Sequence, residues 1–459
     1  MIDQSIECFM GLLFHASNLR MSSPEDPCHK PNRPAVRALP DLAGLPGSSS
    51  SGDADQTPGV PMQLCVVMVS HWKDLWSSKF WLQVAVFDTT APWPTSISIS
   101  RQCTLGLQSQ NIESIPTMSP EPIRQTQLAL NDEDRPRYSS AQLRDYFTRI
   151  ELPQKWLQSP VMSDPAIVGT KEHGLPLLQA LTRHHTCSVP FENLELHYST
   201  HKTVSLDPAD LYTKFVHRRR GGRCMENNTF FATVLRSLGF DVRNCGGRVS
   251  RAMSPFPEVR RNQSATYDGW NHMLNLVRLD GEFFVVDVGM GAMGPNIPYP
   301  LRDGLETTSI APRRIRIQSR SIAESYSKER TSTPKMWCYD FCYEPAGTAD
   351  DKWLPVYCFT ETEFLPQDYE VMSWFTSTHP NSFFTRNVTC TKMLMDESKE
   401  KIVGNNTLFE GTIRETIGTN RKLLKECTSE AERVQALAEI FDVPLTEEEK
   451  NGISGTRLG

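Results

Sequence analysis

The pattern of hydrophobic and polar positions becomes regular after the first 134 residues. Hydrophobic residues then recur on one helix face, after Ser139 or Ser140 as the helix cap. These hydrophobic positions are Leu143, Tyr146, Phe147 and Ile150. A second helix is predicted at residues 175–182, and a third begins with Asp207 as its cap and Pro208 in its first turn. The pattern therefore predicts a helical domain.

From residue 240 to about 365 the hydrophobic positions follow the period of β-strands. The candidate strands are residues 273–279, 283–288, 337–343 and 354–364. Asp280-Gly281, between the first two, is typical of a two-residue hairpin turn, and it sets a register that places Leu274 opposite Asp287. We therefore expect a barrel-like antiparallel sheet in this part of the chain.

The C-terminal part mixes both patterns. Short strands are expected near residues 388–395 and 407–413, followed by a helix that opens with the capping box Ser429 to Glu432 and runs to Phe441. This pattern is typical of a small α/β lid.

The first 134 residues differ from the rest. Residues 24–61 are rich in Pro, Ser and Gly and cannot bury enough apolar surface to offset the entropy of ordering. The predicted parts are a disordered or doubtful N-terminal extension at 1–134, a helical domain at 135–240, a β-barrel domain at 241–365 and an α/β lid at 366–459.

Charge and composition exclude several classes of function. The net charge of −6 and the pI near 6.0 give no general signature for binding polyanions, and the one basic run, residues 218–220 followed by Arg223, is short. Nucleic acid is therefore not expected as a partner.

No run reaches the ~18 apolar residues that a membrane-spanning helix requires. Asp3 and Glu7, with no basic residues before them, argue against a signal peptide.

The 12 cysteines are scattered singly, without a CxxC pair, and no metal site is expected. One glycosylation sequon, at Asn227, lies three residues after Cys224, where a glycan would block a reactive thiol. These features indicate a soluble, cytoplasmic protein in a reducing setting.

The segment before one amphipathic helix carries the strongest sign of chemistry. Gly221-Gly222-Arg223-Cys224 precedes a helix face that begins with Phe230 and ends at Gly239, so Cys224 is expected in the first helical turn. The positive helix end and Arg223 favour the thiolate form of Cys224, and the two glycines let a substrate approach the sulfur. The alternative is that Cys224 is one more small buried side chain.

The predicted hairpin supplies two partners for this thiol. In its register His272 pairs with Gly289 and projects from the same sheet face as Asp287, within side-chain reach. Each residue alone could be structural. Together they suggest a hydrogen-bonded pair, because a carboxylate in an apolar strand is costly to bury without a partner. The other ring nitrogen of His272 would then face Cys224.

A competing motif follows Asp287. Residues 289–294 read GMGAMG, which matches the GxGxxG pattern of dinucleotide-binding sites. Pro295, Pro298 and Pro300 come directly after it and prevent the helix whose N-terminus would hold a pyrophosphate. We therefore interpret the motif as a flexible loop beside the active site.

Four segments in this order resemble the arylamine N-acetyltransferase family, and in particular its fungal members. They are Val189-Pro190-Phe191-Glu192-Asn193-Leu194, the RGGxC stretch that ends at Cys224, Gly269-x-x-His272, and Asp287-Val288-Gly289. The resemblance runs from about Tyr138 to Phe441. It implies an α+β fold with a helical domain, an antiparallel β-barrel and an α/β lid, around a core like that of cysteine proteases and transglutaminases. It also implies a catalytic triad of Cys224, His272 and Asp287.

The resemblance implies roles for further residues. Glu192 and Arg220 match an ion pair that supports the nucleophile loop, and Gly269 matches a position near the acyl-CoA. The expected substrate-binding residues are Gly269, Phe191, Met290 and Arg223. Met290 stands where the family often has an aromatic residue, so we expect it to change the shape of the acceptor pocket.

The implied activity is acyl transfer from acetyl-CoA, a co-substrate rather than a bound cofactor, to the nitrogen of an arylamine, hydrazine or N-hydroxyarylamine. The expected mechanism is ping-pong through an acyl-cysteine, and the expected role is xenobiotic detoxification. Alternatives are malonyl- or propionyl-CoA as the donor, a papain- or transglutaminase-like cysteine hydrolase, and a binding protein without activity.

Overall fold

The computed structural model describes residues 133–254, 257–263, 266–326, 334–344 and 352–458. The expectation for an N-terminal extension, apart from residues 133 and 134, lies outside them. The helices are α2 Ser140–Arg149, α3 Gln154–Leu157, α4 Pro160–Ser163, α5 Gly174–Ser188, α6 Glu195–Tyr198, α7 Pro208–Tyr212, α8 Cys224–Ser237, α9 Pro257–Gln263, α10 Pro366–Thr378, α11 Phe383–Arg386, α12 Glu430–Phe441 and α13 Glu447–Gly452.

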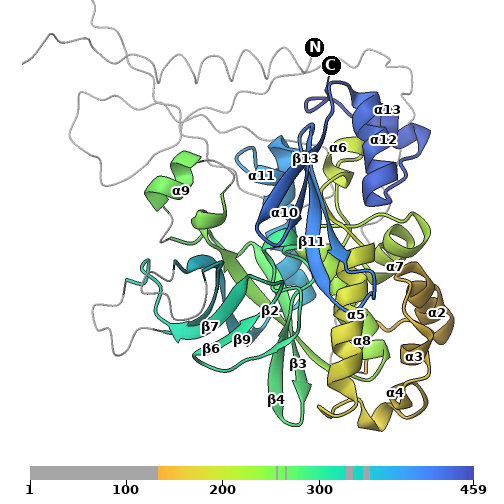
Figure 1. Cartoon of the computed structure of the whole chain (residues 1–459), viewed down its shortest axis with the longest axis vertical. Coiled ribbons are helices and arrows are strands. Elements are labelled where there is room, and N and C mark those ends of the chain that lie inside the picture. Colours follow the sequence, from red (N-terminus) through yellow and green to blue (C-terminus); the bar gives the residue numbers. More distant parts are fainter. Residues whose placement is uncertain (1–132, 255–256, 264–265, 327–333, 345–351, 459) are drawn as a thin grey trace, which may run out of the picture. The chain divides into compact units, whose positions relative to one another are not determined.

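The strands form two antiparallel sheets. They are β1 Phe191–Glu192, β2 Asp241–Val249, β3 His272–Leu279, β4 Glu282–Val286, β5 Tyr299–Pro300, β6 Leu305–Thr308, β7 Arg314–Arg320, β8 Met336–Cys342, β9 Leu354–Glu363, β10 Thr389–Met395, β11 Ile402–Phe409, β12 Thr412–Ile417 and β13 Asn420–Glu426. The barrel-like sheet has the order β5-β4-β3-β2-β9-β8-β7-β6, and the lid sheet has the order β1-β10-β11-β12-β13. In Figure 1 the barrel-like sheet lies on one side, with α2 to α5 and α8 on the other.

The three predicted helices are present. Ser139 caps α2, where its side chain accepts from the backbone N–H of Gln142, and Asp207 caps α7 in the same way. The second helix, α5, is longer than expected. These helices enclose α8, whose Phe230 and Phe231 are completely buried in an apolar core shared with α2, α5 and the β3–β4 hairpin. The core thereby fixes α8 against the sheet.

The hairpin register is as predicted. Asn275 pairs with Val286 and Leu279 with Glu282, so Asp280 and Gly281 are the two turn residues. Both have positive φ, 47° and 78°, as a turn of the mirror-image type requires. This turn fixes which side chains of β3 and β4 share a sheet face.

One predicted strand was wrong in its limits. Residues 407–413 were expected to form a single strand, but β11 ends at Phe409 and β12 begins at Thr412. Glu410 between them has a φ of 55°, so the chain reverses there. Leu408 and Ile413 are paired across the β11–β12 hairpin, and both are buried in one core with α12. Because both are apolar, the two strands look like one continuous strand in the sequence. The predicted α12 is present and capped by Ser429.

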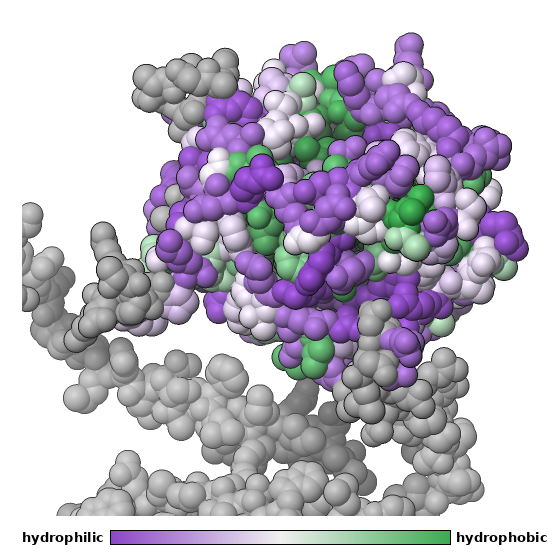
Figure 2. Space-filling model, turned by 90° about the horizontal axis from the view of Figure 1, so that it is seen from below, coloured by the Kyte–Doolittle hydropathy of each residue, from purple (hydrophilic) through white to green (hydrophobic). Residues whose placement is uncertain are grey.

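The hydrophobic residues are mostly enclosed between these elements. On the face shown in Figure 2 they form small patches among hydrophilic residues. No helix in the described part of the chain is long and apolar enough to cross a bilayer.

Replacing Gly281 with alanine tests the hairpin turn. A side chain at this φ is strained, although the space around Gly281 is open, so Gly281→Ala is expected to lower the free energy of unfolding by about 1 kcal/mol. Gly269→Ala is the matched control, because Gly269 has equally open surroundings and no positive φ. Denaturant unfolding of both variants measures the difference. Equal stability of the two would contradict the assigned turn.

Candidate active site

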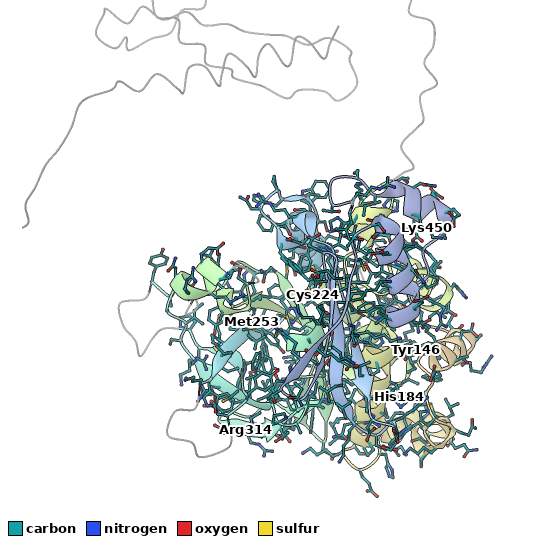
Figure 3. The ribbon with its side chains drawn as sticks, turned by 45° about the horizontal axis from the view of Figure 1, so that its top comes forward. Tyr146, His184, Cys224, Met253, Arg314 and Lys450 are labelled. Carbon is teal, nitrogen blue, oxygen red and sulfur yellow. The ribbon has the colours of Figure 1, made fainter. Side chains whose placement is uncertain are left out.

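Cys224 is the first residue of α8 and is 7% exposed. The chain before it runs close to β1: a side chain on Gly221 would meet the backbone oxygen of Pro190 at 1.9 Å. Only glycine permits this approach. In Figure 3 Cys224 lies in the middle of the described residues, with Met253 and Arg314 on the barrel side and Tyr146 and His184 on the helical side. The thiol is therefore at the junction of the two halves.

His272 and Asp287 meet across the β3–β4 hairpin. The Nε2 atom of His272, the first residue of β3, lies 2.9 Å from Oδ2 of Asp287, one residue beyond β4, and both side chains are buried. The hydrogen bond that the register predicts is thus present. The other ring nitrogen, Nδ1, is buried and has no hydrogen-bond partner among the described residues. The Cys224 thiol donates to the backbone oxygen of Asn271, the residue before His272, with Sγ at 3.7 Å.

The charges of this pair stabilise each other. Burial alone would lower the pKa of His272, but the Asp287 carboxylate outweighs burial, with a smaller contribution from Cys224, and raises this pKa to about 10. Burial would raise the pKa of Asp287, but His272 and the hydrogen bonds from neighbouring groups lower it. A buried, charged imidazole with one ring nitrogen unbonded can transfer a proton to or from a group that approaches it.

Asn228 is the residue of this site that the sequence analysis missed. It lies one turn after Cys224 on α8, and its Nδ2 donates to Asp287 Oδ1 at 3.0 Å and to the backbone oxygen of Met273 at 2.7 Å. Its own Oδ1 accepts from the backbone N–H of Val288 at 3.2 Å. Asn228 thereby ties α8 to β3 and to the residues that follow β4. The sequence offered one signal for this role: Asn228 is a polar residue at a position of α8 that is buried.

Gly289 allows the two halves to approach. Its backbone N–H donates to Asp287 Oδ1 at 2.8 Å, which gives the carboxylate a third donor. A side chain here would come within 2.6 Å of the Cα of Cys224 and 2.5 Å of Asn228. The first residue of the GMGAMG motif therefore packs against the backbone of Cys224. The motif contains a 3-10 helix at Gly291–Met293. No α-helix begins between Gly289 and Pro300.

A buried ion network lies behind the nucleophile segment. Arg220 is 1% exposed, and its guanidinium lies 3.1 Å from Glu192 and 2.5 Å from Glu449. Although burial opposes the charge of Arg220, the carboxylates raise its pKa. Glu192 Oε1 also accepts from the backbone N–H of Gly221 at 3.1 Å. The pair of Glu192 and Arg220 is thus present, but Glu449 of α13 is a third member that the sequence did not indicate.

The four expected substrate-binding residues differ in surroundings. Gly269 is exposed, while Phe191 and Met290 are partly buried: Phe191 lies against Gly291, and Met290 packs against the core of the barrel-like sheet. Arg223 is 3% exposed and its guanidinium contacts α10. Their substrate contacts stay a prediction. Among the described residues, no group of three or more His, Cys, Asp or Glu side chains is arranged to hold a metal ion.

The pH dependence of stability tests the His272–Asp287 pair. Since the folded pKa of His272 is raised above its ordinary value of 6.5 to about 10, the pair stabilises fully below pH 6.5 and loses this contribution as pH rises toward 10. The substitution Asp287→Asn removes the carboxylate and with it this contribution to stability. The difference in unfolding free energy between wild type and Asp287→Asn should therefore shrink between pH 6 and pH 9, by about 1 kcal/mol or more. A constant difference in urea titrations would contradict the charged pair.

Asn228→Ala tests the missed residue. The change leaves buried polar groups of Val288 and Met273 without their partner, and it should lower the free energy of unfolding by about 2 kcal/mol or more. Asn381→Ala, at an exposed position, serves as the control with a change under about 0.5 kcal/mol. If chemical denaturation gave the same value for both variants, Asn228 would not hold α8 to the hairpin.

Comparison with known proteins identifies the family. A family model described as N-acetyltransferase matches residues 174–450. An N-malonyltransferase of Fusarium pseudograminearum is 65% identical over 338 residues, which cover 74% of this chain and 98% of the relative. The fold matches the arylamine N-acetyltransferase of Salmonella typhimurium (TM-score 0.52, 22% identity, 68% of this chain and 97% of the other) and that of Mycobacterium marinum in complex with CoA (TM-score 0.50, 25%, 69% and 100%). The chain therefore belongs to the arylamine N-acetyltransferase family and has its fold.

Proposed function

We propose that this protein transfers the malonyl group of malonyl-CoA to the nitrogen of an arylamine, hydrazine or N-hydroxyarylamine through an acyl-Cys224 intermediate. The observation that carries the proposal is Cys224 at the start of α8 beside the buried His272–Asp287 pair. The family supports acyl transfer, and relatives named N-malonyltransferase at 65% identity favour malonyl over acetyl, the donor first expected.

In the first half-reaction the Cys224 thiolate attacks the thioester carbonyl carbon. The bond between this carbon and the CoA sulfur breaks, and the leaving CoA thiolate takes a proton from the His272 imidazolium. The N–H groups in the first turn of α8 supply donors for the oxyanion. The products are free CoA and malonyl-Cys224, with His272 neutral.

In the second half-reaction the amine nitrogen attacks the carbonyl carbon of malonyl-Cys224. Neutral His272 accepts the proton that the amine loses, and the Cys224 thiolate leaves. This restores the thiolate and the imidazolium. Asp287, held by Asn228 and Gly289, keeps the imidazole oriented and stabilises its charge in both halves.

Two broader proposals accompany this one. The cysteines in the described part of the chain are all unpaired, which supports the expected cytoplasmic setting. Detoxification of aromatic amines is the role that fits the proposed reaction.

A cysteine hydrolase would use the same three residues with water as the acceptor of the acyl group, so the choice of acceptor must be tested directly.

Intact-protein mass spectrometry tests the acyl-cysteine. The full chain is mixed with malonyl-CoA or acetyl-CoA without amine, as wild type, Cys224→Ser and Cys187→Ser. We expect one acyl adduct on wild type, larger in yield with malonyl-CoA, and none on Cys224→Ser. Cys187→Ser should retain the adduct, because burial raises the pKa of the Cys187 thiol to about 12 and keeps it unreactive. Adding an arylamine should remove the adduct and form the amide.

Three results would change the proposal. An adduct that persists on Cys224→Ser would exclude Cys224 as the nucleophile. An adduct with acetyl-CoA alone would replace malonyl by acetyl as the donor group. Loss of the adduct to water at the same rate with and without amine, together with cleavage of peptide amides, would favour the hydrolase.

A further inference from the structure

Arg223 is a buried cation directly beside the proposed nucleophile. It precedes Cys224 in sequence, caps α8, and is 3% exposed. A charged guanidinium is costly to bury unless carboxylates surround it. Three residues earlier, Arg220 meets this requirement, with Glu192, Glu195 and Glu449 within 4 Å. Arg223 is surrounded differently.

The hydrogen-bond partners of Arg223 are neutral hydroxyl groups of α10. Its terminal nitrogens donate to Thr376 at 3.0 Å, Ser377 at 2.6 Å and, more weakly, Ser373 at 3.4 Å. Within the described residues Glu226 is the single carboxylate in ion-pair range, 3.7 Å from Nε.

Glu226 compensates this charge only in part. It lies 2.6 Å from Lys214 and also accepts from the backbone N–H of Arg223. The Nε of Arg223 is buried and has no hydrogen-bond partner among the described residues. The carboxylates near Arg223 therefore balance its charge only in part.

The surroundings place this guanidinium at the site. Phe384 lies 5.3 Å from it, and the Phe384 ring is 6.1 Å from that of Phe191, which contacts the loop after Asp287. The helix that binds Arg223 also contributes Tyr369 and Met372 to one apolar cluster with Cys224. Arg223, α10 and the thiol thus border the same region.

We infer that Arg223 recognises the free carboxylate of the malonyl group while its thioester carbon is bound to Cys224. This inference rests on the proposed function. Malonyl differs from acetyl by one carboxylate, a single methylene away from the reacting carbonyl, so its counter-charge must lie next to the nucleophile. The planar guanidinium matches the two carboxylate oxygens.

The hydroxyl groups of α10 can change their hydrogen-bond partner when a carboxylate binds to Arg223. A hydroxyl both donates and accepts, so Ser373 and Ser377, which now accept from Arg223, can rotate and donate to a carboxylate. The anion would complete the charge balance of Arg223. Acetyl offers no such partner, so the arrangement discriminates between donors.

The test compares donors for the full chain with one arylamine at a fixed concentration. We expect Arg223→Gln to lower the ratio of kcat/KM for malonyl-CoA to that for acetyl-CoA by about 10- to 100-fold, the effect of losing a hydrogen-bonded charge pair. Arg223→Lys should lower the ratio less, because it keeps the charge but loses the planar fork. Thermal unfolding of each variant is measured alongside.

Two control variants separate recognition from support. Thr376→Val removes a contact between Arg223 and α10 but keeps the guanidinium, so it should affect both donors alike. Arg248→Gln removes a second nearby arginine, 4.3 Å from the Trp270 ring, and should leave the donor ratio unchanged. If Arg223→Gln lowered kcat/KM equally for both donors, Arg223 would be only an anchor for α10. If Arg248→Gln lowered the ratio of kcat/KM for malonyl-CoA to that for acetyl-CoA, the carboxylate would be recognised at Arg248 instead.

Acetoacetyl-CoA, a neutral analogue of malonyl-CoA, makes the test independent of folding of the variants. Wild type should prefer malonyl-CoA over this analogue by about 10-fold or more. Equal use of the two would overturn carboxylate recognition. A wild type that forms an adduct with acetyl-CoA but not with malonyl-CoA would refute the proposed donor and this inference together, while leaving the acyl-cysteine route intact.

Discussion

The buried carboxylate of Asp287 is the constraint around which this site is built. Its cost of burial is offset by three donors: the imidazole of His272, the amide of Asn228 and the backbone N–H of Gly289. These come from β3, from α8 and from the loop after β4. Satisfying one charge therefore requires the helix that carries Cys224 to lie against the hairpin that carries His272.

The lid supports the same helix from two other directions. Glu449 of α13 and Glu192 of β1 hold Arg220, and Glu192 in turn holds the backbone of Gly221. From the other side, the hydroxyl groups of α10 hold Arg223. The residues before Cys224 are thus held both by Glu192, which is earlier in the chain, and by α10 and α13, which come much later, so nucleophile geometry depends on the packing of the lid.

The sequence could predict what local pattern determines. Helix caps such as Ser139, and the Asp280-Gly281 turn with its register, depend on neighbours in sequence, and that register was sufficient to bring His272 to Asp287. Glu449 and Asn228 were not predicted, because their partners are set by tertiary packing. The reversal at Glu410 was missed because paired strands with apolar residues in one core read as a single run.

The most direct test of the central claim is the time course of CoA release after rapid mixing with malonyl-CoA in the absence of any amine. Transfer through Cys224 predicts a fast burst of one CoA per protein chain, absent in Cys224→Ser, followed by slow release. Release of CoA that begins only when an arylamine is added would contradict the account, since the acyl group would then pass directly between the substrates.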